Sequence, residues 1–226
     1  MPCAMLTFPC CWLIEVPDAN FSFPRLILVR HGESESNAAN VFTGWADPPL
    51  TEKGEEEARL VGRLLREKGV RIERAFTSAL QRGSRSLQLI LDVLDQRDVE
   101  TSADRALNER DYGILTGLNK SAAASKWGED QVRRWRRSYA DAPPGGESLR
   151  DTTARVLAYY VTTILPAIMA GGTTLIVAHG NSLRALIMTL DGMTPEAIEC
   201  FELSTGATHL FTLAPDTSII GHEILR

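Results

Sequence analysis

The sequence predicts an α/β protein: a three-layer sandwich with a mostly parallel central sheet, helices on both faces and a small helical inserted subdomain. From residue 25 onward, short apolar runs typical of strands alternate with helical patterns, and this alternation is the signature of layered α/β folds. The runs RLILVR at 25–30 and TTLIVAHG at 173–180 are apolar throughout rather than alternating. Continuous apolarity indicates strands that are covered on both faces.

The first half of the chain predicts two strand–helix units. After the strand at 25–30, a helix begins with Thr51 as its N-cap, runs to Lys68 and is closed by Gly69. A second strand ends at Thr77 and Ser78. The helix after it is indicated by leucines that recur at multiples of three or four residues, namely Leu80, Leu87, Leu91 and Leu94.

The second half predicts an insertion followed by the rest of the sheet. A short strand near Val99 leads into a segment from 106 to about 146 that is rich in Arg, Lys and Gly and poor in strand signals, so we expect an inserted cap there. Ser148 then caps a long helix that ends near Pro166. The remaining expected elements are a strand at 173–180, a helix from about Ser182, and a strand pair at about 207–213 and 219–224.

Residues 1–24 are expected to form a poorly ordered N-terminal extension, and residues 25–226 a single catalytic domain. Three of the four cysteines, Cys3, Cys10 and Cys11, lie in the extension without zinc-site spacing, which fits a reducing compartment better than a disulfide framework. The apolar start has no basic residue before it and is broken by prolines, unlike a signal peptide. We therefore expect a cytoplasmic protein.

The charge balance excludes several function classes. Twenty-four Lys and Arg against 29 Asp and Glu give a net charge of −5, whereas a general nucleic-acid binder has a basic excess. No apolar run approaches the roughly 20 residues that cross a bilayer. The expected partners are therefore small molecules, not nucleic acid or membrane.

Two of the four histidines occupy equivalent places, because His31 and His179 each end a buried strand and precede a glycine. Ligands of open α/β sheets bind at the carboxyl ends of the strands, so both imidazoles are expected in one crevice. A single histidine in this context is as readily a hydrogen-bonded core residue, but two matching contexts favour a functional pair. His209 and His222 lack this context, and we expect structural roles for them.

Arginines near these strand ends predict a phosphorylated ligand, because the planar guanidinium binds phosphate bidentately. Arg30 precedes His31, Arg82 opens the helix after Ser78, and Arg136 and Arg137 end the run RRWRR, whose Arg133 and Arg134 fit a solvated helix face. Smaller donors near the expected helix starts suit an anion as well, although each alone is equally typical of a cap or turn: Ser34, Asn37, Thr43 and Asn181.

A hydroxyl that gains or loses phosphate needs a positioned proton carrier. Glu109 is the leading candidate, with Asp104, Asp111 and Glu33 as competitors that spacing does not rank. The chain has no Walker A motif, dinucleotide fingerprint or HExxH motif. These observations favour metal-free transfer through a phosphohistidine, with arginines stabilising the charge.

Six motifs together closely resemble one family, from Arg25 to the C-terminus. They are LVRHGESESN at 28–37, FTGWADPPLTEKG at 42–54, LNERDYGILTGLNK at 107–120, WRRSY at 135–139, GGESLRDT at 145–152 and AHGNSLRAL at 178–186. The chain resembles the cofactor-dependent phosphoglycerate mutases of the histidine phosphatase superfamily. RHG alone indicates the superfamily, whereas FTGW, LNER, GLNK and WRRS are specific to the mutases.

The resemblance implies interconversion of 3-phosphoglycerate and 2-phosphoglycerate, with 2,3-bisphosphoglycerate as phosphoryl donor and no metal, in a homodimer. By motif, His31 takes the phosphoryl group, Glu109 moves the hydroxyl proton and His179 stabilises the transferring phosphoryl. The motif positions that bind substrate are Arg30, Ser34, Asn37, Thr43, Gly44, Arg82, Arg110, Tyr112, Lys120, Arg136, Arg137, Gly180 and Asn181.

The chain departs from the family pattern at a few places. Asp111 stands where His is usual, and Ser36 replaces a Trp. Only ADAPP separates Tyr139 from Gly145, where many members carry a longer segment, so active-site closure and the oligomer interface can differ. The alternative function is a phosphatase of the same superfamily, in which water hydrolyses the phosphohistidine.

Overall fold

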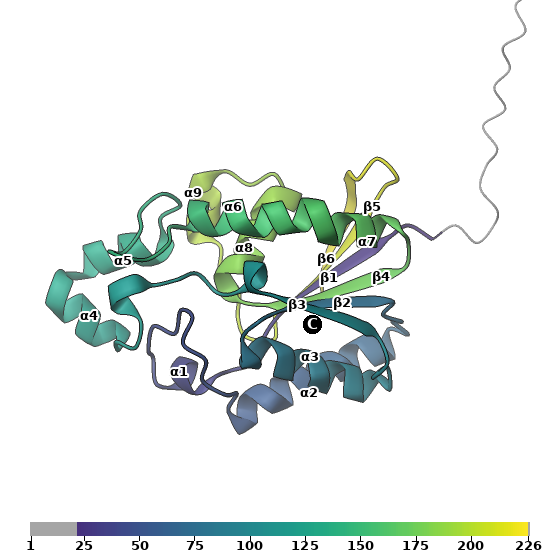
Figure 1. Cartoon of the computed structure of the whole chain (residues 1–226), viewed down its shortest axis with the longest axis horizontal. Helices are drawn as coiled ribbons and strands as arrows, with labels where there is room; N and C mark the ends of the chain where they lie inside the picture. Colours follow the sequence, from purple (N-terminus) through teal and green to yellow (C-terminus); the bar gives the residue numbers. More distant parts are fainter. Residues whose placement is uncertain (1–21, 226) are drawn as a thin grey trace, which may run out of the picture.

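In the computed structural model, which describes residues 22–225, six strands form one sheet in the order β3-β2-β4-β1-β5-β6. The first four of these run parallel, and β5 and β6 are added antiparallel. The predicted mostly parallel α/β sandwich is therefore confirmed, with helices on both sides of the sheet (Figure 1). The strands are β1 (Arg25–Arg30), β2 (Arg74–Ser78), β3 (Glu100–Asp104), β4 (Thr173–Ala178), β5 (Thr208–Leu213) and β6 (Ile219–Leu225).

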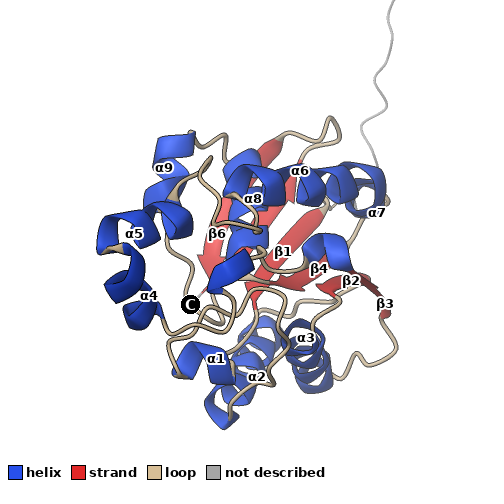
Figure 2. Cartoon of the chain, turned by 60° about the vertical axis from the view of Figure 1, so that its left-hand side comes forward, coloured by secondary structure: helices blue, strands red, loops and turns tan. Residues whose placement is uncertain are grey.

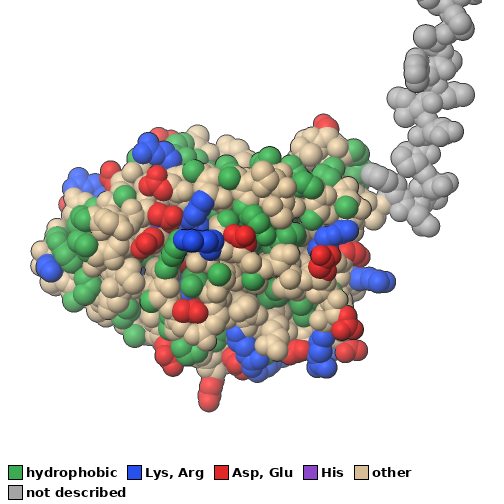
Figure 3. Space-filling view, viewed as in Figure 1, with side chains coloured by type: hydrophobic (Ala, Val, Ile, Leu, Met, Phe, Trp, Pro, Cys, Tyr) green, Lys and Arg blue, Asp and Glu red, His purple; other side chains and the backbone are tan. Residues whose placement is uncertain are grey.

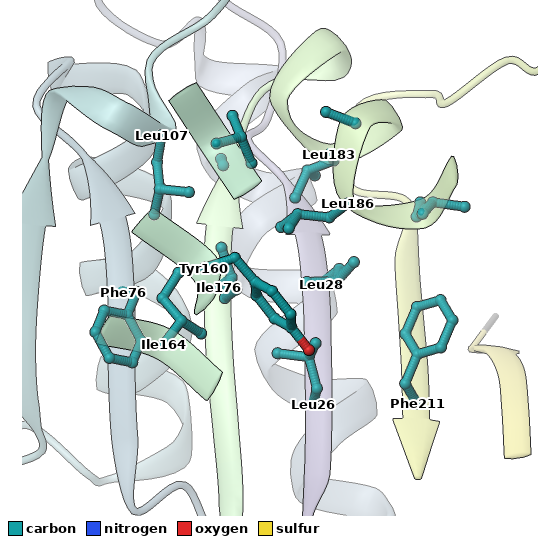
Figure 4. Packing of buried hydrophobic residues seen from close by; sticks show 14 of the residues in the cluster. Leu26, Leu28, Phe76, Leu107, Tyr160, Ile164, Ile176, Leu183, Leu186 and Phe211 are labelled. Atoms are coloured by element: carbon teal, nitrogen blue, oxygen red, sulfur yellow. The ribbon is translucent and has the colours of Figure 1, made fainter. Parts of the chain in front are cut away.

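The residues of β1 alternate between two hydrophobic cores, although all its central side chains are apolar. Leu26 and Leu28 belong to the core under α6 (Leu149–Tyr159), α7 (Leu165–Met169) and α8 (Gly180–Leu190), which Figure 4 shows from close by. Ile27 and Val29 face α2 (Glu52–Glu67) and α3 (Gln81–Leu94). A strand that is covered on both faces needs no polar alternation, so the sequence interpretation of β1 holds.

Helix α2 begins where the sequence predicts, because its N-terminal amides are capped. The Thr51 hydroxyl accepts a hydrogen bond from the Gly54 amide, and Lys68 is the C-cap. Helix α3 follows β2 as expected and packs along α2. Both helices lie below the sheet in Figure 1.

Two predicted helix boundaries are wrong. The helix capped by Ser148 does not end near Pro166 but continues to Met169 through a π-helical segment, Tyr160–Ile164. Proline lacks an N–H and crowds the carbonyl four residues earlier, and a wider turn before it relieves both conflicts. The helix expected from about Ser182 begins two residues earlier, at Gly180, with His179 as its N-cap.

Short helices lie outside the predicted strand–helix units. They include α1 (Glu35–Ala38), α4 (Lys120–Trp127), α5 (Glu129–Arg137) and α9 (Pro195–Cys200). Two of them, α4 and α5, fall in the inserted segment that was expected to be helical. Helices α4 and α5 extend beyond the carboxyl ends of β1 and β4 (Figure 2) and share a small core of Phe42, Leu115, Ala123 and Val132. No helix among residues 22–225 is both long and apolar enough to span a bilayer.

Candidate active site

A cavity of about 210 Å³ opens where β1 and β4 end, lined by residues of the sheet side and of helices α4 and α5. Its charged lining residues are five cations and two acids. The residues that line it are Arg30, Asn37, Val41, Phe42, Thr43, Gly44, Glu109, Tyr112, Lys120, Arg136, Arg137, Gly180, Asn181, Arg184, Glu202 and Leu203. By contrast, acidic and basic side chains are interspersed over the outer face in Figure 3.

The two strand-end histidines meet beneath this cavity. Because β1 and β4 are paired in parallel with Arg30 opposite Ala178, the next residues, His31 and His179, lie side by side. Their ring centroids are 4.8 Å apart, and both side chains are almost fully buried. The two imidazoles therefore lie together, as expected. The cavity lining contains their chain neighbours Arg30 and Gly180 but not the rings themselves, so the entry of both imidazoles into one ligand crevice stays a prediction.

The hydrogen bond of His31 fixes which ring nitrogen is free. Nδ1 lies 2.6 Å from the Gly32 carbonyl oxygen, which can only accept, so Nδ1 carries the proton. Burial, with Arg30 and Arg82 nearby, holds the pKa of His31 well below its usual 6.5. The ring is therefore neutral at pH 7, and Nε2 presents a lone pair for nucleophilic attack.

His179 is also neutral but is held differently. Burial and the charge of Arg82 lower its pKa well below 6.5. Its Nε2 lies 2.7 Å from the Ser78 hydroxyl oxygen at the end of β2, while Nδ1 has no hydrogen-bond partner among the described residues. His179 thus keeps one ring nitrogen available to a ligand.

The turn after His31 depends on close backbone contact with α2. A Cβ atom at Gly32 would lie 2.0 Å from the Gly54 carbonyl oxygen, so no side chain fits at this position. The Gly32 amide also donates to the Ser86 hydroxyl on α3 at 3.1 Å. Both helices below the sheet therefore fix the position of His31.

Glu109 extends into the same cavity with its two carboxylate oxygens in different surroundings. Oε1 accepts three hydrogen bonds, from the Arg110 amide at 2.8 Å, the Asn181 amide at 3.0 Å and the Asn181 side-chain Nδ2 at 2.9 Å. Its carbonyl oxygen accepts from Trp45 Nε1 at 2.7 Å and Arg155 Nη2 at 2.9 Å. The group is therefore fixed at both ends, with Oε2 directed toward the cavity.

The competing carboxylates have other partners and do not line the cavity. Glu33 pairs with Lys53 at 2.8 Å, and Asp104 accepts from the Ala106 amide. Asp111, one of the departures from the family pattern, accepts from the Gly113 amide at 2.9 Å. Of the four carboxylates, Glu109 alone lines the cavity, and its role as proton carrier stays a prediction.

The outer wall of the cavity is formed by cations from α4 and α5. Lys120 is the first residue of α4, and Arg136 and Arg137 end α5. Burial, together with the charge of Arg136, lowers the pKa of Lys120. Arg133 is three-quarters exposed, so the predicted division of the RRWRR run between solvent and site agrees with the structure.

Three predicted binding residues lie behind the lining. Arg82 donates to the carbonyl oxygens of Gly44 and Ala46 at 2.9 and 2.8 Å, and thereby fixes the loop that carries Thr43. Arg110 donates to the Arg136 carbonyl oxygen at 2.6 Å. Ser34 caps α1 by accepting from the Asn37 amide. Contact of these three with substrate stays a prediction.

Several residues that line the cavity or hold Glu109 were not predicted from the sequence. Arg184 and Glu202 line the cavity, and Trp45 and Arg155 hold Glu109. Arg184 stands three positions after Asn181, and this helical spacing would have pointed to it once the start of α8 was placed at Gly180. For Arg155, 46 residues from Glu109, the sequence carries no such signal.

The other two histidines form a separate pair outside the cavity. His209 Nδ1 lies 2.8 Å from His222 Nε2, and His222 Nδ1 lies 3.1 Å from an Asp191 carboxylate oxygen. The His222 ring stacks on Phe211 with centroids 4.0 Å apart. This arrangement joins β5, β6 and the end of α8, in agreement with the expected structural role.

The family model of the histidine phosphatase superfamily, branch 1, matches residues 26–221. A 2,3-bisphosphoglycerate-dependent phosphoglycerate mutase from Beijerinckia indica is 56% identical over 201 residues, which cover 89% of this chain and 97% of the relative. A protein of the same name from Xanthobacter autotrophicus is 58% identical over 194 residues, covering 86% of this chain and 94% of the relative.

Two of the solved structures with a similar fold carry the name of phosphatases. The α-ribazole phosphatase from Shigella flexneri is 26% identical with a TM-score of 0.74, covering 89% of this chain and 94% of that one. A mycobacterial glucosyl-3-phosphoglycerate phosphatase is 21% identical with a TM-score of 0.76, covering 89% and 97%. The second similarity shows a shared fold only.

Proposed function

Because the chain belongs to the histidine phosphatase superfamily, branch 1, we propose that it interconverts 3-phosphoglycerate and 2-phosphoglycerate, with 2,3-bisphosphoglycerate as phosphoryl donor and bound intermediate. One observation carries the proposal: the neutral His31 lies beneath a cavity whose opposite wall presents Lys120, Arg136 and Arg137. Such a site can hold a second anionic group while the first reacts. This proposal places the reaction in glycolysis and gluconeogenesis.

The residues present fit a bisphosphorylated ligand. A buried nitrogen of Arg30, which lines the cavity, and Nδ1 of the neighbouring His179 have no hydrogen-bond partner among the described residues. A Cβ atom at Gly180 would lie 3.6 Å from Glu109 Oε2 and 3.8 Å from the Arg30 guanidinium carbon, so glycine leaves this part of the crevice open. When bound, 2,3-bisphosphoglycerate supplies the phosphoryl group.

His31 carries the phosphoryl group in this mechanism. Nε2 attacks phosphorus, and the ester bond to the leaving oxygen breaks. The proton stays on Nδ1, which keeps its hydrogen bond to the Gly32 carbonyl oxygen. Arg30 and His179 lie beside the reacting imidazole and stabilise the charge on the phosphoryl oxygens. Arg82 adds positive charge to the same region.

Glu109 moves the proton. In transfer from His31 to the 2-hydroxyl of 3-phosphoglycerate, Glu109 Oε2 accepts the hydroxyl proton as the oxygen attacks phosphorus and the bond to Nε2 breaks. After the bound molecule turns, His31 takes the 3-phosphoryl group and Glu109 returns the proton to the 3-oxygen. The cycle is balanced, and the cations of α4 and α5 hold the non-reacting end.

A phosphatase is the second candidate, because the 26%-identical solved structure carries that name. In that reaction water takes the phosphoryl group from His31, and Glu109 again moves the proton. Lys120, Arg136 and Arg137 favour the mutase, because simple hydrolysis does not require the alcohol product to be retained.

The deciding experiment supplies 3-phosphoglycerate with and without a trace of 2,3-bisphosphoglycerate and follows both 2-phosphoglycerate and free phosphate. We expect isomer formation that depends on the trace donor, with little phosphate released. Phosphate release without isomer would sink the mutase proposal and support the phosphatase.

The proposed steps use no metal ion. EDTA is therefore expected to leave the mutase rate unchanged, measured before and after dialysis against metal-free buffer. Strong inhibition that a divalent cation reverses would contradict the mechanism.

We further propose that the enzyme is a cytoplasmic homodimer. Light scattering on the purified protein is expected to give twice the chain mass of 24.9 kDa. A monomer mass at assay concentration would overturn this part of the proposal.

A further inference from the structure

Glu109 needs its free oxygen aimed at the substrate, and the hydrogen bonds that aim it come largely from one residue. Asn181 donates to Glu109 Oε1 through both its backbone amide and its side-chain Nδ2, at 3.0 and 2.9 Å. Nδ2 also lies 3.2 Å from the Tyr112 hydroxyl oxygen. These bonds occupy Oε1 and leave Oε2 for proton transfer.

The Asn181 amide can make these bonds in only one orientation. A carboxamide has a donor end and an acceptor end that are alike in shape, so neighbouring groups decide which way it points. If the amide turned over, Oδ1 would face the Glu109 carboxylate oxygen and repel it. Some group must therefore hold Oδ1 on the opposite side.

Arg184 is that group. Its Nη1 donates to Asn181 Oδ1 at 2.9 Å, and a guanidinium can only donate, so Oδ1 must face it. The side chain is 4% exposed, and its Nη2 donates to the Ile198 carbonyl oxygen before α9 ends. Arg184 is thus fixed from both sides, with no carboxylate within ion-pair distance among residues 22–225.

We propose that Arg184 is a positioning residue, which orients the Asn181 carboxamide so that Glu109 keeps Oε2 directed at the substrate hydroxyl. The inference rests on the proposed function, since it assumes that Glu109 moves a proton. It predicts that removing the Arg184 donor lowers the rate of proton transfer without removing any group that touches the substrate's reacting atoms.

The first test replaces Arg184 with Met and with Lys. Arg184→Met has no donor, so kcat is expected to fall by about 10- to 100-fold, the usual effect of losing a group that orients a functional side chain. The acidic limb of the kcat/KM profile should also move to higher pH, because the freed amide can turn its oxygen to Glu109. Arg184→Lys keeps one donor and should recover most of kcat.

The matched control is Arg133→Met, which changes an exposed arginine outside the cavity. It should change neither kcat nor the pH of the acidic limb.

The second test separates this role from simple anchoring of α9. If Arg184 acts through Asn181, Arg184→Met should cost less than about twofold in an Asn181→Ala background, because the amide is already gone. A full loss in that background, or an unshifted acidic limb, would overturn the inference. Thermal melts check folding, and Arg184→Gln replaces the methionine variant in the same cycle if the latter does not fold.

Failure of this inference and failure of the proposed function would give different experimental results. If the wild-type protein releases phosphate instead of forming isomer, the mutase proposal fails, and the Arg184 comparison is then made on phosphate release, which also needs the proton carrier. If wild type is a mutase but the two losses are additive, only the Arg184 inference fails.

Discussion

The two walls of the active site are built in different ways. His31, His179 and Arg82 stand at the ends of buried strands or in α3, and each is at most 2% exposed. Lys120 and Arg136, on α4 and α5, are only partly buried. In the proposed mechanism, the reacting groups are therefore held rigidly, while the groups proposed to bind the substrate can adjust.

The supporting cores explain this difference. The sheet wall is held between two large hydrophobic clusters, one on each face. The wall of α4 and α5 rests on a small cluster whose buried members are Phe42, Leu115, Ala123 and Val132. Elements with fewer buried apolar contacts open locally at lower free energy. The wall formed by α4 and α5, the gripping wall, should therefore be more mobile than the sheet wall.

The largest expected effect is at the sheet wall. His31→Ala removes the only group that carries the phosphoryl in the mechanism, so kcat should fall on the order of 10⁴-fold or more. Brief exposure to labelled 2,3-bisphosphoglycerate should leave acid-labile, base-stable phosphate on the wild-type protein and none on the variant. Equal labelling of both would show that the nucleophile is another residue.

The sheet wall should also make stability depend on pH. In the folded chain the pKa values of His31 and His179 lie well below 6.5, so on acidification the unfolded chain binds protons first. The free energy of unfolding should therefore fall between pH 7.5 and 5.5, by about 1.4 kcal/mol for each of the two. Burial also lowers the pKa of His209, to about 4, so three histidines contribute. Urea titrations measure the total, and His31→Asn should remove about a third of the histidine contribution. A flat dependence would contradict the buried neutral state.

The gripping wall should affect binding rather than chemistry. Lys120→Met removes a half-buried ammonium group from the cavity, so KM for 3-phosphoglycerate should rise by about 10- to 30-fold with a smaller change in kcat. Lys126→Met, exposed on the same helix, is the matched control. A loss confined to kcat would mean that the two walls do not divide these tasks.

The smallest expected effect concerns the ion pair between Arg137 and Glu202. Arg137 forms an ion pair with Glu202, which is largely exposed, and an incoming phosphate or carboxylate must compete with it. Glu202→Gln should lower KM by about two- to threefold, in keeping with the small strength of exposed ion pairs. Glu196→Gln on α9 serves as the control. A higher KM would show that Glu202 helps binding.

The sequence predicted the strands of the sheet wall better than the ends of the helices, for a physical reason. Strand periodicity and the His-Gly pairs are local signals, so β1, β4 and their histidines could be placed directly. The helix boundaries at Pro166 and Ser182 failed because a π-helical turn and an N-capping histidine override local propensity. Helix α9 was missed altogether.

The choice of proton carrier depended on contacts over long sequence distances. Glu109, Asp104, Asp111 and Glu33 are equivalent in local sequence, and the family resemblance alone favoured Glu109. The structure separates them because Asn181, 72 residues away, meets Glu109, while the other three are bound at caps or ion pairs.

By itself, the sequence determined the layered fold, the two strand-end histidines and the cationic character of the site, because these follow from local apolar patterns and side-chain chemistry. Only the tertiary structure decided which nitrogen of His31 is free, which oxygen of Glu109 is available and that Arg184 holds Asn181 in place. The bond between Asn181 and Glu109 joins residues 72 positions apart. The other two bonds are local in sequence, but they depend on side-chain orientations that tertiary packing sets.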